Sequence, residues 1–194
     1  MDFGGLLVIL VLKMLIQEGC MKRIAILVEN LYEDLELHYP YLRLKEAGFQ
    51  VDLIGPEKGV EYLSKHGYPA ISDFASSQIS AQDYAAVVVP GGYSPDMMRR
   101  CEATIEFVRQ MDAQGKIVAA ICHGPWIMAS ACNLSGRTLT SFFSIRDDLV
   151  NAGATYVDEE VVLSGNLITS RTPQDLIAFT TAIISALGQS DPEL

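Results

Sequence analysis

Residues 116–132 read KIVAAICHGPWIMASAC, and this stretch decides the fold. Its first six residues form a short apolar run rich in β-branched side chains, as expected of a strand buried on both faces. Small residues then surround Cys122, and Pro125 suits the first turn of a helix, which we predict over 125–132. A buried strand that runs directly into a helix is the building unit of a parallel α/β sheet.

The same alternation continues on both sides of this stretch. The sequence predicts further strands at 24–28, 49–54, 85–90 and 138–142, and helices at 33–47, 102–114, 145–151 and from 172 to about 187. Residues 57–72 read as a loop or hairpin, and 156–170 as a hairpin centred on Gly165-Asn166. Pro40 indicates a kink or a late start in the first helix. We therefore predict a flavodoxin-like α/β/α sandwich with a mainly parallel sheet and a nucleophile elbow.

Composition bounds the size of the core and the classes of partner. The 194 residues are 49% apolar and carry 24 acids against 14 bases, a formal net charge of −10. This apolar fraction is ample for one core, and we predict a single domain over 21–188 with a tail at 189–194. No basic face is evident in the sequence, which argues against nucleic acid and against anionic membrane surfaces as binding partners.

Residues 1–20, MDFGGLLVILVLKMLIQEGC, form a separate N-terminal extension. The apolar run at 6–12 is too short to span a bilayer. Asp2 and the lack of a preceding positive charge are wrong for a signal peptide. We expect the natural start at Met21, with the extension non-native, and keep a targeting role as the alternative.

The four cysteines, at positions 20, 101, 122 and 132, form no CxxC pair and no zinc-ligand spacing. Reduced thiols in the cytoplasm fit a chain with a large core better than a disulfide framework does. We expect no metal and no cofactor.

Cys122 follows a buried strand and precedes a helix, with Ala120 and Gly124 two residues away on either side. This is the spacing of a nucleophile elbow, in which small neighbours allow a sharp turn that exposes the nucleophile. The helix N-terminus should lower the pKa of the thiol, and the N–H of His123 would face an oxyanion formed on an attacked carbonyl. The alternative is a buried structural thiol, which we prefer for Cys101 and Cys132.

The chain has three histidines, at positions 38, 66 and 123. No histidine follows position 123, which excludes the glutaminase triad that needs one far downstream of its cysteine. His123 is therefore the leading candidate for a general base or acid. We expect His38 to be structural and leave the role of His66 open.

Five stretches together carry a family resemblance: YEDLELHYPYLRLKEAG (32–48), VVVPGGYSPDMM (87–98), AAICHGPWIM (119–128), SIRDDLVNAGA (144–154) and ITSRTPQDL (168–176). From Met21 to about Leu187 the chain resembles the PfpI-type intracellular protease family. That family lies in the class I glutamine amidotransferase-like superfamily, which includes the parkinsonism-associated deglycase.

The resemblance implies roles for single residues. Cys122 matches the family nucleophile and His123 the adjacent histidine. Glu33 matches the acid that hydrogen-bonds the nucleophile, and a carboxyl beside a thiolate should hold the proton because two adjacent anions are costly. The alternative for Glu33 is an acid of the first helical turn, a role that Asp34 and Glu36 fit better.

Three more positions match the family pattern. Asp96 stands where members carry a glutamate that reaches the histidine of a neighbouring subunit, and it is one methylene shorter. Its alternative is a solvated loop aspartate. Gly91 and Gly92 match the turn on the oxyanion side, where backbone N–H groups approach closely; a simple tight turn is the other interpretation.

The resemblance implies a cysteine enzyme with glyoxalase III-like or deglycase-like action on methylglyoxal or its protein adducts. An intracellular cysteine peptidase is the second hypothesis. A redox-sensing stress chaperone without turnover is the third, because a reactive cysteine is also readily oxidised. The resemblance also implies a homo-oligomer, a dimer or a hexamer, that acts on a small aldehyde or a glycated or peptide substrate.

Overall fold

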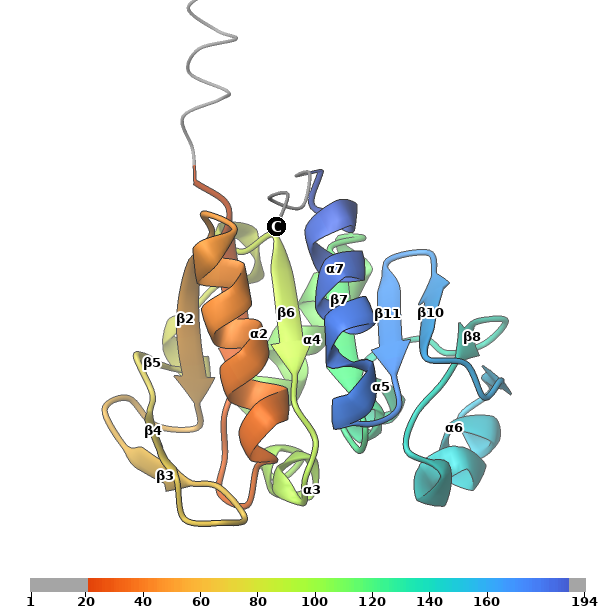
Figure 1. Ribbon diagram of the computed structural model, residues 1–194, viewed down its shortest axis with the longest axis horizontal. Coiled ribbons are helices and arrows are strands. Elements are labelled where there is room, and N and C mark those ends of the chain that lie inside the picture. The colour runs from red at the N-terminus through yellow and green to blue at the C-terminus, as the bar shows by residue number, and fades with distance from the viewer. Residues whose placement is uncertain (1–20, 189–194) are drawn as a thin grey trace, which may run out of the picture.

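The computed structural model describes residues 21–188; the predicted extension at 1–20 and tail at 189–194 lie outside the described residues. A seven-stranded sheet of order β10-β11-β7-β6-β1-β2-β5 forms the centre (Figure 1). Only the β10–β11 pair is antiparallel. The strands are β1 Arg23–Leu27, β2 Gln50–Gly55, β5 Phe74–Ala75, β6 Ala86–Val89, β7 Ile117–Ile121, β10 Val161–Ser164 and β11 Leu167–Ser170. The predicted flavodoxin-like arrangement is confirmed.

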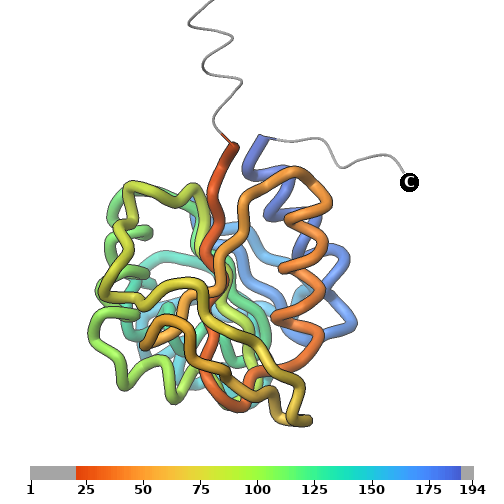
Figure 2. Tube along the Cα trace, turned by 90° about the vertical axis from the view of Figure 1, so that its left-hand side faces the viewer, coloured from red at the N-terminus to blue at the C-terminus, as the bar shows by residue number. Residues whose placement is uncertain are grey.

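Helices cover both faces of the sheet. α2 (Asp34–Glu46) and α7 (Leu176–Ala186) lie on one face, and α4 (Glu102–Ala113) and α5 (Pro125–Ala131) lie on the other (Figures 1 and 2). The shorter α3 (Ser94–Met98) follows β6, and α6 (Arg146–Asn151) lies beyond the β10 edge. This two-sided cover explains why the central strands read as unbroken apolar runs.

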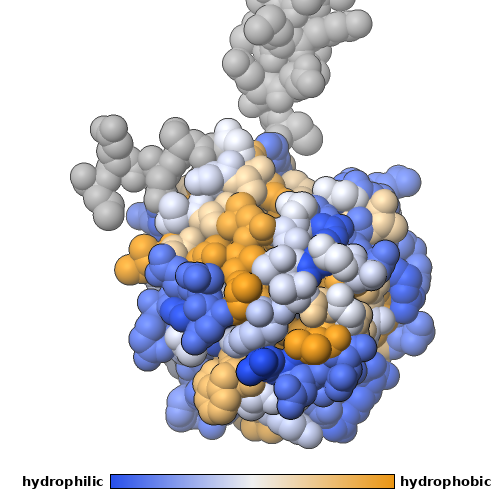
Figure 3. Space-filling view, turned by 90° about the vertical axis from the view of Figure 1, so that its right-hand side faces the viewer, coloured by the Kyte–Doolittle hydropathy of each residue, from blue (hydrophilic) through white to orange (hydrophobic). Residues whose placement is uncertain are grey.

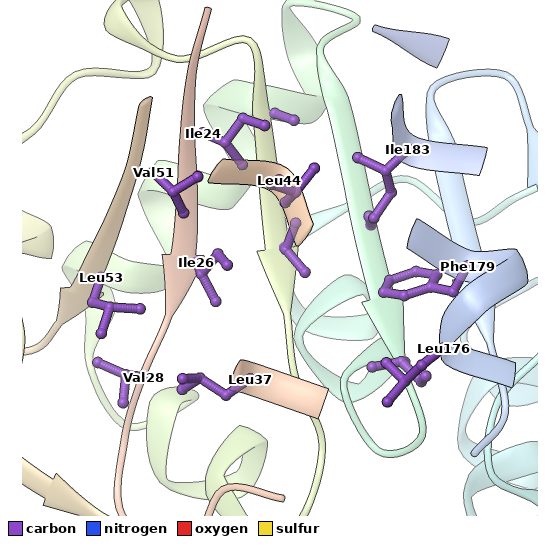
Figure 4. Close-up of a cluster of buried hydrophobic side chains, with 14 of the residues drawn as sticks. Ile24, Ile26, Val28, Leu37, Leu44, Val51, Leu53, Leu176, Phe179 and Ile183 are labelled. Atoms are coloured by element: carbon purple, nitrogen blue, oxygen red, sulfur yellow. The ribbon is translucent and has the colours of Figure 1, made fainter. Parts of the chain in front are cut away.

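Each face of the sheet has its own apolar core. Ile24 and Ile26 of β1 pack toward α2 and α7, where Phe179 and Ile183 are fully buried (Figure 4). The alternate residues of β1 pack against α4 and α5 on the opposite face. This alternation follows from the two-residue period of side chains along a strand.

The structure refines several predicted elements. Pro40 lies within α2 without ending it. The strand expected at 138–142 is only β8 (Thr138–Leu139), which pairs with β9 (Thr155–Tyr156) outside the central sheet, because β10 occupies the sheet edge. The segment 57–72 forms the hairpin of β3 (Glu61–Leu63) and β4 (Pro69–Ile71), and the predicted hairpin at 156–170 is the β10–β11 pair. Neither β5 nor α3 was predicted from the sequence.

The surface on the side of β10 and α6 is mostly hydrophilic with separate apolar patches (Figure 3). Leu163 of β10 and Val150 of α6 are among the exposed apolar side chains. Within residues 21–188, no helix combines the length and the apolar character needed to cross a bilayer.

Candidate active site

The candidate site lies where the carboxyl ends of β1, β6, β7 and β11 meet, which is the ligand-binding edge of an open α/β sheet. Cys122 follows β7 directly, and its φ of 61° is in the left-handed region that non-glycine residues rarely adopt. Such a conformation costs about 1–2 kcal/mol. Gly124 permits the turn, because a Cβ there would lie 2.8 Å from the carbonyl oxygen of Ile121. The predicted elbow is therefore present.

The sulfur of Cys122 is nearly buried, with the residue 8% exposed. The backbone N–H groups of Gly92 and His123 donate hydrogen bonds to it, and the Glu36 carboxyl forms a further hydrogen bond with it. Three polar groups thus converge on one sulfur, an environment suited to a reactive cysteine.

Glu36, and not Glu33, is the carboxyl beside the sulfur, so the prediction for Glu33 was wrong. Glu36 is fully buried, and its Oε2 accepts a hydrogen bond of 2.8 Å from the N–H of Gly91. Glu33 instead caps α2: one carboxylate oxygen accepts from the N–H of Glu36 at 2.9 Å, and the other lies 3.5 Å from Nζ of Lys65. Because α2 begins at Asp34, Glu33 is its N-cap and its side chain folds back onto the first turn of the helix. The side chain of Glu36, three positions later, points toward the carboxyl edge of the sheet.

The bond from Gly91 to Glu36 also changes the prediction for the glycine pair. The Gly91 N–H is engaged by the carboxyl and is not free for a substrate oxyanion. The Gly92 N–H faces the sulfur. A Cβ on Gly91 would lie 2.6 Å from Glu36 Oε2 and 2.8 Å from the Cβ of Cys122, so only glycine fits between them.

Glu36 and Cys122 form a coupled acid pair in a dry pocket. Burial, together with the charge of Glu33, raises the pKa of Glu36 to about 7. Burial and the charge of Glu36 raise the pKa of the Cys122 thiol to about 12. The expectation that the helix N-terminus alone lowers the pKa of this thiol was wrong, since desolvation outweighs the backbone N–H groups. The pair therefore retains one proton across neutral pH.

The two oxygens of the Glu36 carboxyl have different surroundings. Oε1 of Glu36 is buried, and no nitrogen or oxygen partner reaches it among the described residues. The Glu36 carboxyl as a group interacts with the sulfur of Cys122 through a side-chain hydrogen bond. The carboxyl and the sulfur are therefore the two groups between which the remaining proton of the pair is held.

His123 lies against the other side of the sulfur. Its Nδ1 is 3.2 Å from Sγ of Cys122, and its Nε2 is 3.1 Å from Oγ of Ser144, a residue that the sequence analysis did not single out. Phe142 stacks on the imidazole at 5.1 Å, and Trp126 meets its edge at 5.0 Å. Burial lowers the pKa of His123, so the ring is neutral at pH 7 and can accept a proton.

The remaining candidates lie away from the sulfur. Asp96 is on α3, outside the pocket lining, and pairs with Arg100, which lowers the pKa of the aspartate. His38 contacts the hydroxyl of Tyr32 at 3.1 Å, in agreement with the structural role expected for it. His66 pairs with Asp34 at 2.7 Å and is mostly exposed.

A pocket of about 280 Å³ opens above Cys122. It is lined by Glu33, Glu36, Lys65, Gly92, Cys122, His123, Phe142, Thr172, Pro173 and Gln174. Within the described part of the chain, no three His, Cys, Asp or Glu side chains lie close enough together to hold a metal ion. A thiol, a buried carboxyl and a neutral imidazole thus line one small cavity.

Comparison with known proteins shows which family contains this arrangement of residues. The sequence model of the "DJ-1/PfpI family" matches residues 22–186. The chain belongs to the DJ-1/PfpI family. This membership confirms the resemblance drawn from the five motifs.

Members of the DJ-1/PfpI family resemble this chain over nearly its whole described length. "Deglycase PfpI" of Pyrococcus furiosus is 44% identical over 165 residues, 85% of this chain and 99% of that protein. "Putative cysteine protease YraA" of Bacillus subtilis is 43% identical over 166 residues, 86% of this chain and 98% of that protein. The crystal structure of Drosophila melanogaster DJ-1beta superposes with a TM-score of 0.82 at 29% identity, covering 88% of this chain and 92% of that one. The relatives' names point to enzyme activity in the family.

Proposed function

We propose that this protein is a cysteine-dependent enzyme with glyoxalase III-like or deglycase-like action on methylglyoxal or its protein adducts. The observation that carries the proposal is the contact of one sulfur with a buried carboxyl and a neutral imidazole, Glu36 on one side and His123 at 3.2 Å on the other. The names of the deglycase relatives support the deglycase-like part of the proposal.

The first step is addition of sulfur to an aldehyde carbon. The reactive form has the shared proton on Glu36, which leaves Cys122 as a thiolate that accepts hydrogen bonds from Gly92, His123 and Glu36. The thiolate forms a C–S bond with the aldehyde, and the carbonyl oxygen takes a proton to give a hemithioacetal. With a protein adduct as substrate, the thiolate forms the same C–S bond. The C–N bond of the adduct breaks, and the released amine takes up a proton.

The second step moves a proton within the bound hemithioacetal. Nδ1 of His123 removes the proton from the former aldehyde carbon and returns it to the neighbouring carbon, which converts the hemithioacetal of methylglyoxal into a thioester. Water then cleaves the thioester to lactate and restores Cys122. The sum is methylglyoxal plus water to lactate, so atoms and electrons balance without an external oxidant or reductant.

The test measures methylglyoxal consumption and lactate formation. We expect Cys122→Ala to abolish both and His123→Ala to reduce them by about 10²–10⁴-fold, the usual contribution of a general base. Turnover that survives Cys122→Ala refutes the proposal. Hydrolysis of peptides in its place would favour the peptidase hypothesis, and holdase activity indifferent to Cys122 would favour the chaperone. The homo-oligomeric state and cytoplasmic location stay predictions.

A further inference from the structure

The proposed reaction needs a hydrogen-bond donor for a second substrate oxygen. Methylglyoxal carries two adjacent carbonyl groups, and in the hemithioacetal the second carbonyl oxygen lies one carbon beyond the carbon bonded to sulfur. The N–H groups of Gly92 and His123 face the sulfur, and the N–H of Gly91 is held by Glu36. The second oxygen must therefore be met by a side chain of the pocket.

Lys65 is the side chain that fits this need. It lines the pocket with Cys122, and no other lysine or arginine does so among the described residues. Its Nζ lies 3.5 Å from Oε1 of Glu33, and an ammonium group has three N–H donors, so donors remain after this contact. We propose that Lys65 is a substrate-binding residue whose ammonium group donates a hydrogen bond to the second carbonyl oxygen of a 1,2-dicarbonyl substrate, an inference that rests on the proposed function.

The turn that carries Lys65 is fastened to the start of α2. The N–H of Lys65 donates a hydrogen bond of 2.9 Å to the carbonyl oxygen of Tyr32. On either side of the lysine, Oγ of Ser64 donates to one carboxylate oxygen of Asp34 at 2.7 Å, and Nδ1 of His66 lies 2.7 Å from the other. Neither Asp34 nor His66 lines the pocket. These contacts give His66, whose role the sequence left open, a part in holding Lys65 at the pocket.

A cation at the second oxygen assists the step in which that oxygen becomes negative. When Nδ1 of His123 removes the C–H proton, the electron pair of that bond forms a C=C bond, and the π electrons of the second carbonyl move onto its oxygen. A charge-assisted hydrogen bond from Lys65 stabilises this enolate oxygen more than the neutral carbonyl. The enolate oxygen then takes the proton of the hemithioacetal hydroxyl, and His123 returns its proton to carbon, so protons and electrons balance.

The kinetic experiment compares Lys65→Met, Lys65→Arg and Lys58→Met in methylglyoxal turnover. Loss of a hydrogen bond to a charged group predicts about a 10–100-fold lower kcat/KM for Lys65→Met, expressed mainly in kcat. Lys65→Arg keeps a charged donor and should exceed Lys65→Met by about tenfold. Lys58→Met is the matched control, because Lys58 is exposed and lies outside the pocket lining. Each variant is measured on the plateau above its pH inflection, where the effect of Lys65 on the pKa of Glu36 does not enter. Equal kcat/KM values for Lys65→Met and Lys58→Met overturn the proposal.

A second measurement is independent of turnover. Iodoacetate and iodoacetamide alkylate the same sulfur and differ only in carrying a carboxylate or a neutral amide. The ratio of their rates at Cys122 therefore cancels any change in the thiolate fraction. We expect the ratio of iodoacetate to iodoacetamide to fall about 3–10-fold in Lys65→Met, because the attraction between ammonium and carboxylate is lost. It should stay near the wild-type value in Lys65→Arg and Lys58→Met. An unchanged ratio in Lys65→Met overturns the proposal.

The two measurements separate failure of this inference from failure of the proposed function. Turnover that is absent from wild type or survives Cys122→Ala refutes the proposed function, and the alkylation ratio then still decides whether the ammonium group of Lys65 reaches an oxygen anion beside Cys122. A lowered ratio with unchanged turnover in Lys65→Met places the ammonium group in the pocket but not on the reacting oxygen. That result overturns the proposal and leaves the proposed function intact.

Discussion

Replacing Glu36 with glutamine tests whether the acid of the site is buried with a raised pKa. The side chain is fully buried, and burial raises its pKa from the ordinary glutamate value to about 7. That difference corresponds to about 3 kcal/mol. Because the folded state binds this proton more tightly than the unfolded chain, wild-type stability falls as the pH rises through this range. About 2–3 kcal/mol of the loss lies between pH 5 and pH 8.

Urea unfolding of wild type and Glu36→Gln at pH 5 and pH 8 measures this effect, because glutamine does not titrate. We expect the free energy of unfolding of Glu36→Gln to rise by about 2–3 kcal/mol relative to wild type from pH 5 to pH 8. Glu102→Gln is the control, since that side chain is 87% exposed on α4, and its stability should follow wild type. Parallel pH profiles for Glu36→Gln and wild type would refute the reasoning.

Three further changes have defined outcomes. Gly91→Ala puts a methyl group 2.8 Å from the Cβ of Cys122. Mass spectrometry of alkylated protein should then show slower modification of Cys122. An unchanged rate would contradict the close packing of Gly91 against this cysteine. Phe179→Ala removes a fully buried ring and should lower the free energy of unfolding by about 3–5 kcal/mol in urea titrations, whereas a loss below about 1 kcal/mol would argue against this core. Lys65→Met removes a positive charge that lowers the pKa of Glu36, so the wild-type stability loss between pH 5 and pH 8 should move to higher pH, and no movement would exclude the charge effect.

The sequence predicted the part of the site that is encoded locally. The apolar run before Cys122, the small residues around it and Pro125 all lie within ten positions, and each has its own conformational preference. The strand, the turn and the helix follow from those preferences. The alternation of apolar strands and helices fixed the sheet class for the same reason.

The partners of Cys122 were harder to predict because they depend on element boundaries and distant contacts. Glu33 and Glu36 are three positions apart, and only the observed start of α2 at Asp34 decides which of them reaches the sulfur. Ser144 lies 21 residues beyond His123, and no periodic pattern connects the two. The pKa of the thiol depends on burial, which no local motif reveals.

The pH dependence of Cys122 alkylation in wild type and Glu36→Gln tests the central claim most directly. The claim is that Cys122 and Glu36 hold two protons at acidic pH, lose one of them near neutral pH and then share the other. Site-resolved mass spectrometry separates this cysteine from the partly buried Cys101 and Cys132. We predict that the wild-type rate rises through about pH 7 and that the rise moves to alkaline pH in Glu36→Gln, where the thiol must lose its proton alone. The same inflection in both proteins, or a wild-type inflection at the ordinary cysteine pKa, would contradict the account.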